Sequence, residues 1–141
     1  MRQTMQEIPY RFYLHWDNAE LSAVEILRRA HDLITFGWCQ GADARDTDLL
    51  PVDPWSARAC HWSLLGALVA ALGTPEDDSP ESPELLSQLR LALLAISELI
   101  PDWSLQHWND NPQRTQAGVV QMLAAAHDDC SIEAANHLSD R

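Results

Sequence analysis

The sequence contains no lysine, so all nine basic residues are arginine, and they are outnumbered by 21 acidic residues. The formal net charge is -12 at pH 7. Because such a negative field repels phosphate backbones and anionic headgroups, we expect the chain to bind neither nucleic acid nor a membrane. An inhibitor that mimics the charge of DNA is the one nucleic-acid role left open, although acidic residues are concentrated only at 76–81.

Long apolar runs and paired cysteines are also lacking. No apolar stretch approaches the roughly 18 residues of a transmembrane helix, and the first seven residues contain no apolar signal segment. The three cysteines, Cys39, Cys60 and Cys130, are an odd number at no disulfide-like spacing. These absences predict a cytoplasmic protein with reduced thiols.

Sequence patterns for metals and phosphates are missing as well. There is no CxxC, no HxxxH and no glycine-rich phosphate loop in the chain. We therefore expect no metal site and no cofactor.

Apolar residues make up 46% of the 141 residues, which is enough to form the core of one domain. Their spacing predicts helices at about 19–36, 54–72, 83–100 and 115–127, with a weak further turn at 131–137. The expected fold class is all-α, a compact bundle of four main helices with a central apolar helix and two long ordered loops. We expect residues 1–141 to form a single helical domain, in which three segments are peripheral: an N-terminal arm at 1–17, an acidic linker at 74–82 and a weakly ordered tail at 129–141.

The second predicted helix has a clear start, with Asp53 as N-cap followed by Pro54. Small residues recur along it at spacings of three or four: Ser56, Ala59, Cys60, Ser63, Gly66, Ala67, Ala70 and Gly73. This pattern favours close approach of a neighbouring helix, and a ligand groove is the alternative. Ser63 would then lie within the helix, with its hydroxyl bonded to the carbonyl of Ala59.

The residues capable of chemistry fall in the two long loops. The first loop holds Cys39, Gln40, Arg45 and Asp46, and the second holds or precedes His107, Asn109, Asp110 and Arg114. The structural interpretation is that Arg114 pairs with Asp46 or Asp110 to tie the loops together, above Trp38 and Trp108. The same residues, Gln40, Arg45, Asp46, Asn109, Asp110 and Arg114, are the candidates for ligand binding.

A catalytic alternative uses Cys39 as nucleophile, His107 as base and Asn109 to orient the imidazole. Such groups need to be close in space and not in sequence. Against this hypothesis, Cys39 does not begin a predicted helix, so no helix dipole would lower its pKa.

Three patterns together resemble a family of small bacterial and phage proteins of unknown function. They are Trp38-Cys39-Gln40-Gly41-Ala42 with Ala44-Arg45-Asp46, then Ser63-Leu64-Leu65-Gly66-Ala67, then Trp108-Asn109-Asp110 with Pro112, Arg114 and Thr115. The resemblance covers most of residues 20–127 and implies a shared fold and a shared polar cluster. Relatives usually have Cys at position 63 and an acidic residue at position 118, where it would complete a capping box with Thr115.

We therefore expect a small binding or accessory module with a polar site between the 38–46 and 103–114 loops. Its partner would be a small molecule or a protein. The alternative is a small cofactor-free enzyme, a hydrolase or transferase, that uses the same loops.

Overall fold

The computed structural model describes residues 21–73, 83–101 and 104–139, so the expected N-terminal arm and acidic linker lie outside the described residues. The chain is mostly helical. In order, the described elements are α2 (Ala23–Phe36), β1 (Ala44–Arg45), β2 (His61–Trp62), α3 (Leu64–Ala71), α4 (Pro83–Ser97), α5 (Leu105–Asn109) and α6 (Gln116–Ser139). The helical fold class is thus confirmed in outline, but it includes a small sheet and is not four helices with loops.

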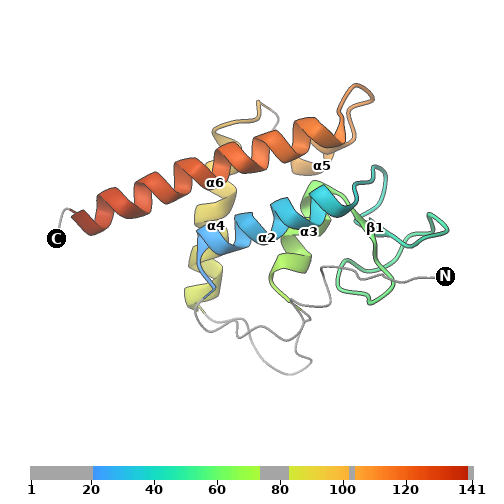
Figure 1. Cartoon of the computed structure of the whole chain (residues 1–141), viewed down its shortest axis with the longest axis horizontal. Helices are drawn as coiled ribbons and strands as arrows, with labels where there is room; N and C mark the ends of the chain where they lie inside the picture. Colours follow the sequence, from blue (N-terminus) through green and yellow to red (C-terminus); the bar gives the residue numbers. More distant parts are fainter. Residues whose placement is uncertain (1–20, 74–82, 102–103, 140–141) are drawn as a thin grey trace.

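Helices α2 and α6 lie side by side and run in opposite directions, as Figure 1 shows. α2 also contacts α3 and α4, so it is the helix that touches most of the others. Large side chains from several elements are fully buried between them: Ile26, Leu27, Leu33, Ile34, Leu64, Leu68, Ile96, Val119 and Leu123. The core is therefore centred on α2, and not on the second predicted helix.

The ends of α2 follow from its capping residues. Ser22 is the N-cap, and its hydroxyl accepts a hydrogen bond from the amide of Glu25. Gly37 ends the helix, close to the predicted boundary at residue 36, and its backbone is extended (φ -166°). A side chain at Gly37 would overlap the carbonyl oxygen of Cys60. Glycine is required there because two backbone segments touch, which the sequence pattern could not show.

Arg29 is a charged residue of α2 that lies in the core. It is buried, its Nη1 donates to the carbonyl oxygen of Ala71 at 2.8 Å, and its Nε donates to Glu25 at 3.2 Å. The guanidinium thus joins α2 to the C-terminal end of α3, where carbonyl groups have no partner within the helix. A long side chain of this kind can reach from a polar stripe into the core.

The second predicted helix is wrong in its first half. Only Leu64–Ala71 is helical, and the Asp53-Pro54 signal begins a turn and not a helix. The preceding residues pair as backbone with the first loop: the amide of Cys60 donates to Arg45, and the amide of Trp62 donates to Gly37. Tertiary pairing of this kind overrides the local helical preference of 54–63.

The sheet is small and is fixed by Trp62. Strands β1 and β2 are antiparallel, with Ala44 opposite Trp62 and Arg45 opposite His61. Trp62 is fully buried, and its Nε1 donates to the carbonyl oxygen of Pro54 at 3.0 Å. The ring therefore holds the 54–60 turn, and the sheet holds the first loop, against the helical core.

Ser63 is the N-cap of α3 and not an interior helical residue. Its hydroxyl accepts a hydrogen bond from the amide of Gly66 at 3.0 Å, and its own amide donates to the carbonyl oxygen of Asp43 at 3.0 Å. That same carbonyl occupies the place of a Cβ on Gly66. At Gly66, the missing side chain therefore admits a loop backbone.

Helix α6 is one continuous element over the range predicted as a helix, a break and a weak turn. Thr115 caps it, because its hydroxyl accepts a hydrogen bond from the amide of Gly118 at 3.0 Å. Its C-terminal part extends beyond the other helices in Figure 1, and residues 132–136 are exposed. Within the described ranges, no helix is both long enough and apolar enough to cross a membrane.

Candidate functional site

Asn109 joins the two loops that were predicted to carry the site. It is fully buried at the end of α5, and its Oδ1 accepts hydrogen bonds from the Trp38 indole at 2.8 Å and the Leu64 amide at 3.0 Å. Its Nδ2 donates to the carbonyl oxygen of Cys39 at 3.2 Å and to Asp110 at 3.0 Å. All four hydrogen-bonding positions of the amide are filled, so Asn109 holds the site together and has no capacity left for a ligand.

Gln40 and Asp110 complete the junction of the loops. The side-chain amide of Gln40 donates to the carbonyl oxygens of Asn109 and Asn111 at 2.9 and 2.8 Å. One carboxylate oxygen of Asp110 accepts from the amide of Gly41 at 3.1 Å. The structure therefore brings Cys39, Gln40, Asn109 and Asp110 together through direct hydrogen bonds.

Arg45 and Asp46 lie in the same loop but organise its tip. The guanidinium of Arg45 donates to the carbonyl oxygens of Gln40 and Leu49. Asp46 Oδ1 accepts from the amides of Asp48 and Leu50 at 2.9 and 3.0 Å. These amides, together with the nearby Arg58 guanidinium, hold the pKa of Asp46 below its usual value.

Two ion-pair expectations are corrected. Asp46 pairs with Arg58 at 3.1 Å and not with Arg114. Arg114 stacks on the Trp108 ring, with 3.7 Å from its guanidinium carbon to the ring centroid, and its Nε donates to the Trp108 carbonyl oxygen. The loops are therefore tied by amide and backbone hydrogen bonds. Neither the Arg58–Asp46 pair nor the Arg114–Trp108 contact links one loop to the other.

The arrangement does not support the Cys-His-Asn hypothesis. The Cys39 thiol donates to the Ala42 carbonyl oxygen at 3.6 Å, and burial raises its pKa to about 11. The Asn109 amide is filled by other partners, and His107 lies on the exposed side of α5. A protonated, buried thiol is a poor nucleophile at neutral pH.

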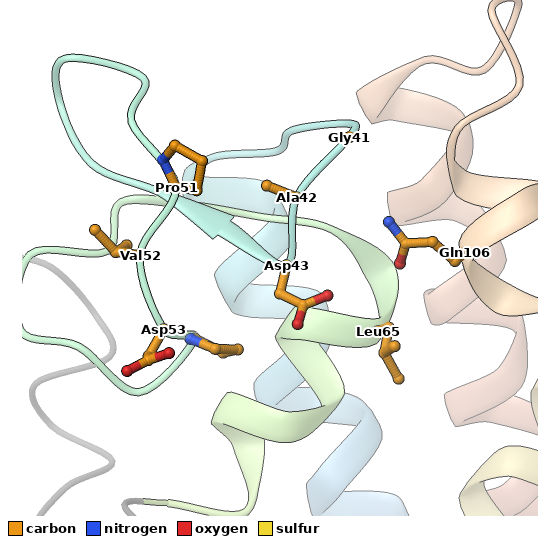
Figure 2. A pocket seen from close by; sticks show the side chains of 9 residues that line it. Gly41, Ala42, Asp43, Pro51, Val52, Asp53, Leu65 and Gln106 are labelled. Atoms are coloured by element: carbon orange, nitrogen blue, oxygen red, sulfur yellow. The ribbon is translucent and has the colours of Figure 1, made fainter.

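A pocket of about 750 Å³ opens beside this junction, and we call it the loop pocket. It is lined by residues 41–43 and 51–54 with Leu65 and Gln106. Figure 2 shows these side chains around one hollow, with Gln106 reaching in from α5 opposite the two loop segments. Apolar side chains also line it: Pro51, Val52, Pro54 and Leu65, the last of which lies at the start of α3.

Polar groups in the loop pocket are mostly hydrogen-bond acceptors. Asp43 and Asp53 are exposed, and no described residue hydrogen-bonds or pairs with either carboxylate. Gln106 Nε2 donates to Asp110 Oδ2 at 3.2 Å, whereas Gln106 Oε1 is buried and accepts no hydrogen bond from any described residue. A buried acceptor without a donor is uncommon in folded proteins and carries a desolvation cost.

The loop pocket lies between the two predicted loops, but most of its lining was not predicted. Asp43, Asp53, Leu65 and Gln106 were outside the candidate set. Asp53 was predicted to be a helix cap, and Leu65 to lie within the second helix. The unusual length of the first loop was the available signal, since long loops in small domains are commonly functional.

A groove of about 810 Å³ lies among α2, α4 and α6, and it is lined mainly by apolar residues with acids at its edge. Among residues 21–73, 83–101 and 104–139, no three His, Cys, Asp or Glu side chains lie close enough together to hold a metal ion.

Comparison with known families assigns the chain to one of them. The model of a family of unknown function, DUF6197, matches residues 19–129. The chain belongs to this family. The DUF6197 match spans α2 to α5 and the first half of α6, and so includes every residue of the loop pocket. The resemblance to a family of unknown function seen in the sequence is confirmed at this level.

No curated protein and no solved structure matches the chain.

Proposed function

We propose that the chain is a small binding module that holds a ligand or a partner's side chain in the loop pocket. The observation that carries this proposal is the pocket itself, a preformed hollow between two loops that the buried Asn109 fixes in place. Binding sites in small domains are usually few, concave and largely formed before the ligand arrives.

The loops around the pocket are rigid in the way a binding site requires. Asn109, Gln40 and Asp110 connect them by hydrogen bonds between residues about 70 positions apart in sequence. Since these contacts are made within the chain itself, little conformational entropy remains to be lost on binding. The candidate ligand-binding residues Gln40, Arg45, Asp46, Asn109, Asp110 and Arg114 would then act by shaping the pocket.

Binding is favoured over catalysis by the chemistry of the lining. None of the described residues in the loop pocket is a cysteine, serine, threonine or histidine. The lining offers carboxylates, one amide and apolar surface, which suit recognition better than covalent catalysis.

A fragment screen by two-dimensional NMR tests the proposal. Fragments of varied charge should shift the amide signals of Gly41, Asp43, Val52 and Leu65. Ala42→Trp should fill the pocket and abolish these shifts, because Ala42 lies in its wall (Figure 2). Ala57→Trp is the matched control, since Ala57 is exposed outside the pocket. Shifts confined to the groove among α2, α4 and α6, or none at all, would overturn the proposal.

A further inference from the structure

The loop pocket offers acceptors on a rigid apolar frame, and this combination selects a ligand. The carboxylates of Asp43 and Asp53 come from two different loop segments and have no described partner. Between these segments and α5, the buried Oε1 of Gln106 also has no hydrogen-bond donor among the described residues. Ionised carboxylates and amide oxygens accept hydrogen bonds, so all three groups can accept one from a ligand.

The orientation of the Gln106 amide is fixed by its other end. Its Nε2 donates to Asp110 Oδ2, and Asp110 Oδ1 is itself held by the amides of Gly41 and Asn109. Turning the Gln106 amide over would place its oxygen against a carboxylate, which is unfavourable. The unsatisfied atom of Gln106 is therefore its oxygen, an acceptor.

The arginines nearest to the loop pocket are already engaged and do not line it. Arg45 donates to the carbonyl oxygens of Gln40 and Leu49, and Arg58 pairs with Asp46. Neither guanidinium forms an ion pair with Asp43 or Asp53. In a chain of net charge -12, a free cation would be attracted to this place.

The remaining wall of the loop pocket is apolar and comes from Pro51, Val52, Pro54 and Leu65. Aliphatic stems of lysine and arginine pack on such surfaces while their charged heads reach polar groups. We propose that the loop pocket binds an aliphatic cation, a methylene chain that ends in a guanidinium or ammonium group. This inference rests on the proposed function and names the chemistry of its ligand.

Such a cation has two sources, the side chain of a partner protein or a free amine, and titrations followed by NMR separate them. The probes are N-acetyl-arginine amide and N-acetyl-lysine amide for a protein side chain, and agmatine and putrescine for free amines. N-acetyl-citrulline amide is the neutral control, because it has nearly the shape of the arginine probe without its charge. We expect the cationic probes to shift loop-pocket amides at low ionic strength and the citrulline probe to bind several-fold more weakly.

Matched variants locate the interaction. Asp43→Asn and Asp53→Asn should each weaken binding of the cationic probes by about three- to fivefold. Asp48→Asn removes the same charge from an exposed residue of the same loop outside the lining, and it should change binding by less than about twofold. Gln106→Met should weaken binding of the cationic probes because it removes the Oε1 acceptor. It should lower the melting temperature only slightly, because the side-chain hydrogen bond that it also removes, from Nε2 to Asp110 Oδ2, is partly exposed.

The inference and the proposed function fail in different ways. Equal binding of the citrulline probe, or equal loss in all three Asp→Asn variants, would overturn the cation assignment. If neutral or anionic fragments still shifted the same amides, the loop pocket would remain a binding site with another ligand. Binding of the amines alone, without the arginine and lysine probes, would support the assignment and identify a free amine as the source.

Discussion

At the scale of single residues, the site depends on a side chain that no ligand needs to touch. Asn109 is fully buried, and it supplies two acceptor and two donor interactions to groups from three segments. Buried polar groups are stabilising only while every partner is satisfied. The position of the loop pocket therefore depends on one amide.

Replacing Asn109 should lower the free energy of unfolding by far more than the small size of its side chain suggests. Asn109→Asp keeps the shape but turns two donated hydrogen bonds into repulsion toward the Cys39 carbonyl oxygen and Asp110. We expect a loss of about 3 kcal/mol or more in the free energy of unfolding, measured by urea denaturation. Asn111→Asp is the control, because Asn111 is exposed and its Oδ1 acts only as an acceptor, so it should lose less than about 1 kcal/mol. Similar losses for both variants would contradict this role.

Cys39 should be unreactive near neutral pH. Burial raises its pKa from 9.0 to about 11, and the thiolate is the reactive form. At pH 8 its alkylation in a Cys60→Ser/Cys130→Ser background should be slower than that of the unfolded protein by about 100-fold, the ratio of the two thiolate fractions. The rate should rise with pH up to the raised pKa and level off only above it. Rapid labelling at pH 7 would restore Cys39 as a candidate nucleophile.

At the scale of elements, α3 and the first loop form one unit joined through backbone atoms. The amide of Ser63 donates to Asp43, and the same Asp43 carbonyl lies where Gly66 lacks a side chain. The position of Asp43, and hence of its carboxylate in the loop pocket, is thereby set by the first turn of α3.

Gly66→Ala should separate α3 from the loop. The added methyl group would overlap the carbonyl group of Asp43, which is backbone and cannot rotate away. We expect a loss of about 3 kcal/mol or more in the free energy of unfolding, with changed amide signals at residues 41–44. Gly118→Ala, in the first turn of α6, meets only the Thr115 hydroxyl and should stay within about 1 kcal/mol of the parent. A mild effect at Gly66 would show that the loop can move.

Ser63→Ala should remove a helix cap from a buried position. The hydroxyl accepts a hydrogen bond from the amide of Gly66, so its loss should cost about 1–2 kcal/mol in a thermal or urea melt. Ser104→Ala removes the corresponding cap of the short helix α5 at a more exposed place and should cost less. If Ser63→Ala were silent, another donor or acceptor would have to take over the cap.

At the scale of the whole molecule, α6 contributes unevenly along its length. Its first half supplies buried Val119, Met122, Leu123 and Ala126 to the core against α2, whereas residues 132–136 are exposed. The family match ends at residue 129, inside this helix.

Shortening α6 should therefore be tolerated from its end and not from its middle. A chain that stops after Ser131 should lose less than about 1 kcal/mol in the free energy of unfolding. A chain that stops after Val120 removes Met122, Leu123 and Ala126 from the core and should fail to fold, as circular dichroism would show. A large loss on removing residues 132–141 would mean that the C-terminal end of α6 has partners that the described residues do not reveal.

Sequence patterns located those elements whose signals are local. The apolar stripe of α2, the start of α4 at Pro83 and the meeting of the two loops could all be inferred from spacing and composition. The pattern failed at 54–63, because pairing of Cys60 and Trp62 with the first loop depends on contacts distant in sequence. The sequence patterns also missed the loop pocket, because Asp43 and Gln106 line it together only in the folded chain and are far apart in sequence.

The hydrogen bonds of Asn109 also constrain the order in which the chain folds. Asn109 lies 45 to 71 residues along the chain from its partners Leu64, Cys39 and Trp38. Closing a loop of that length costs entropy before any contact is gained. These hydrogen bonds alone do not repay that cost, so we expect them to form together with the packing of the helices that flank the pocket. The loop pocket is then expected to form with the tertiary core and not before it.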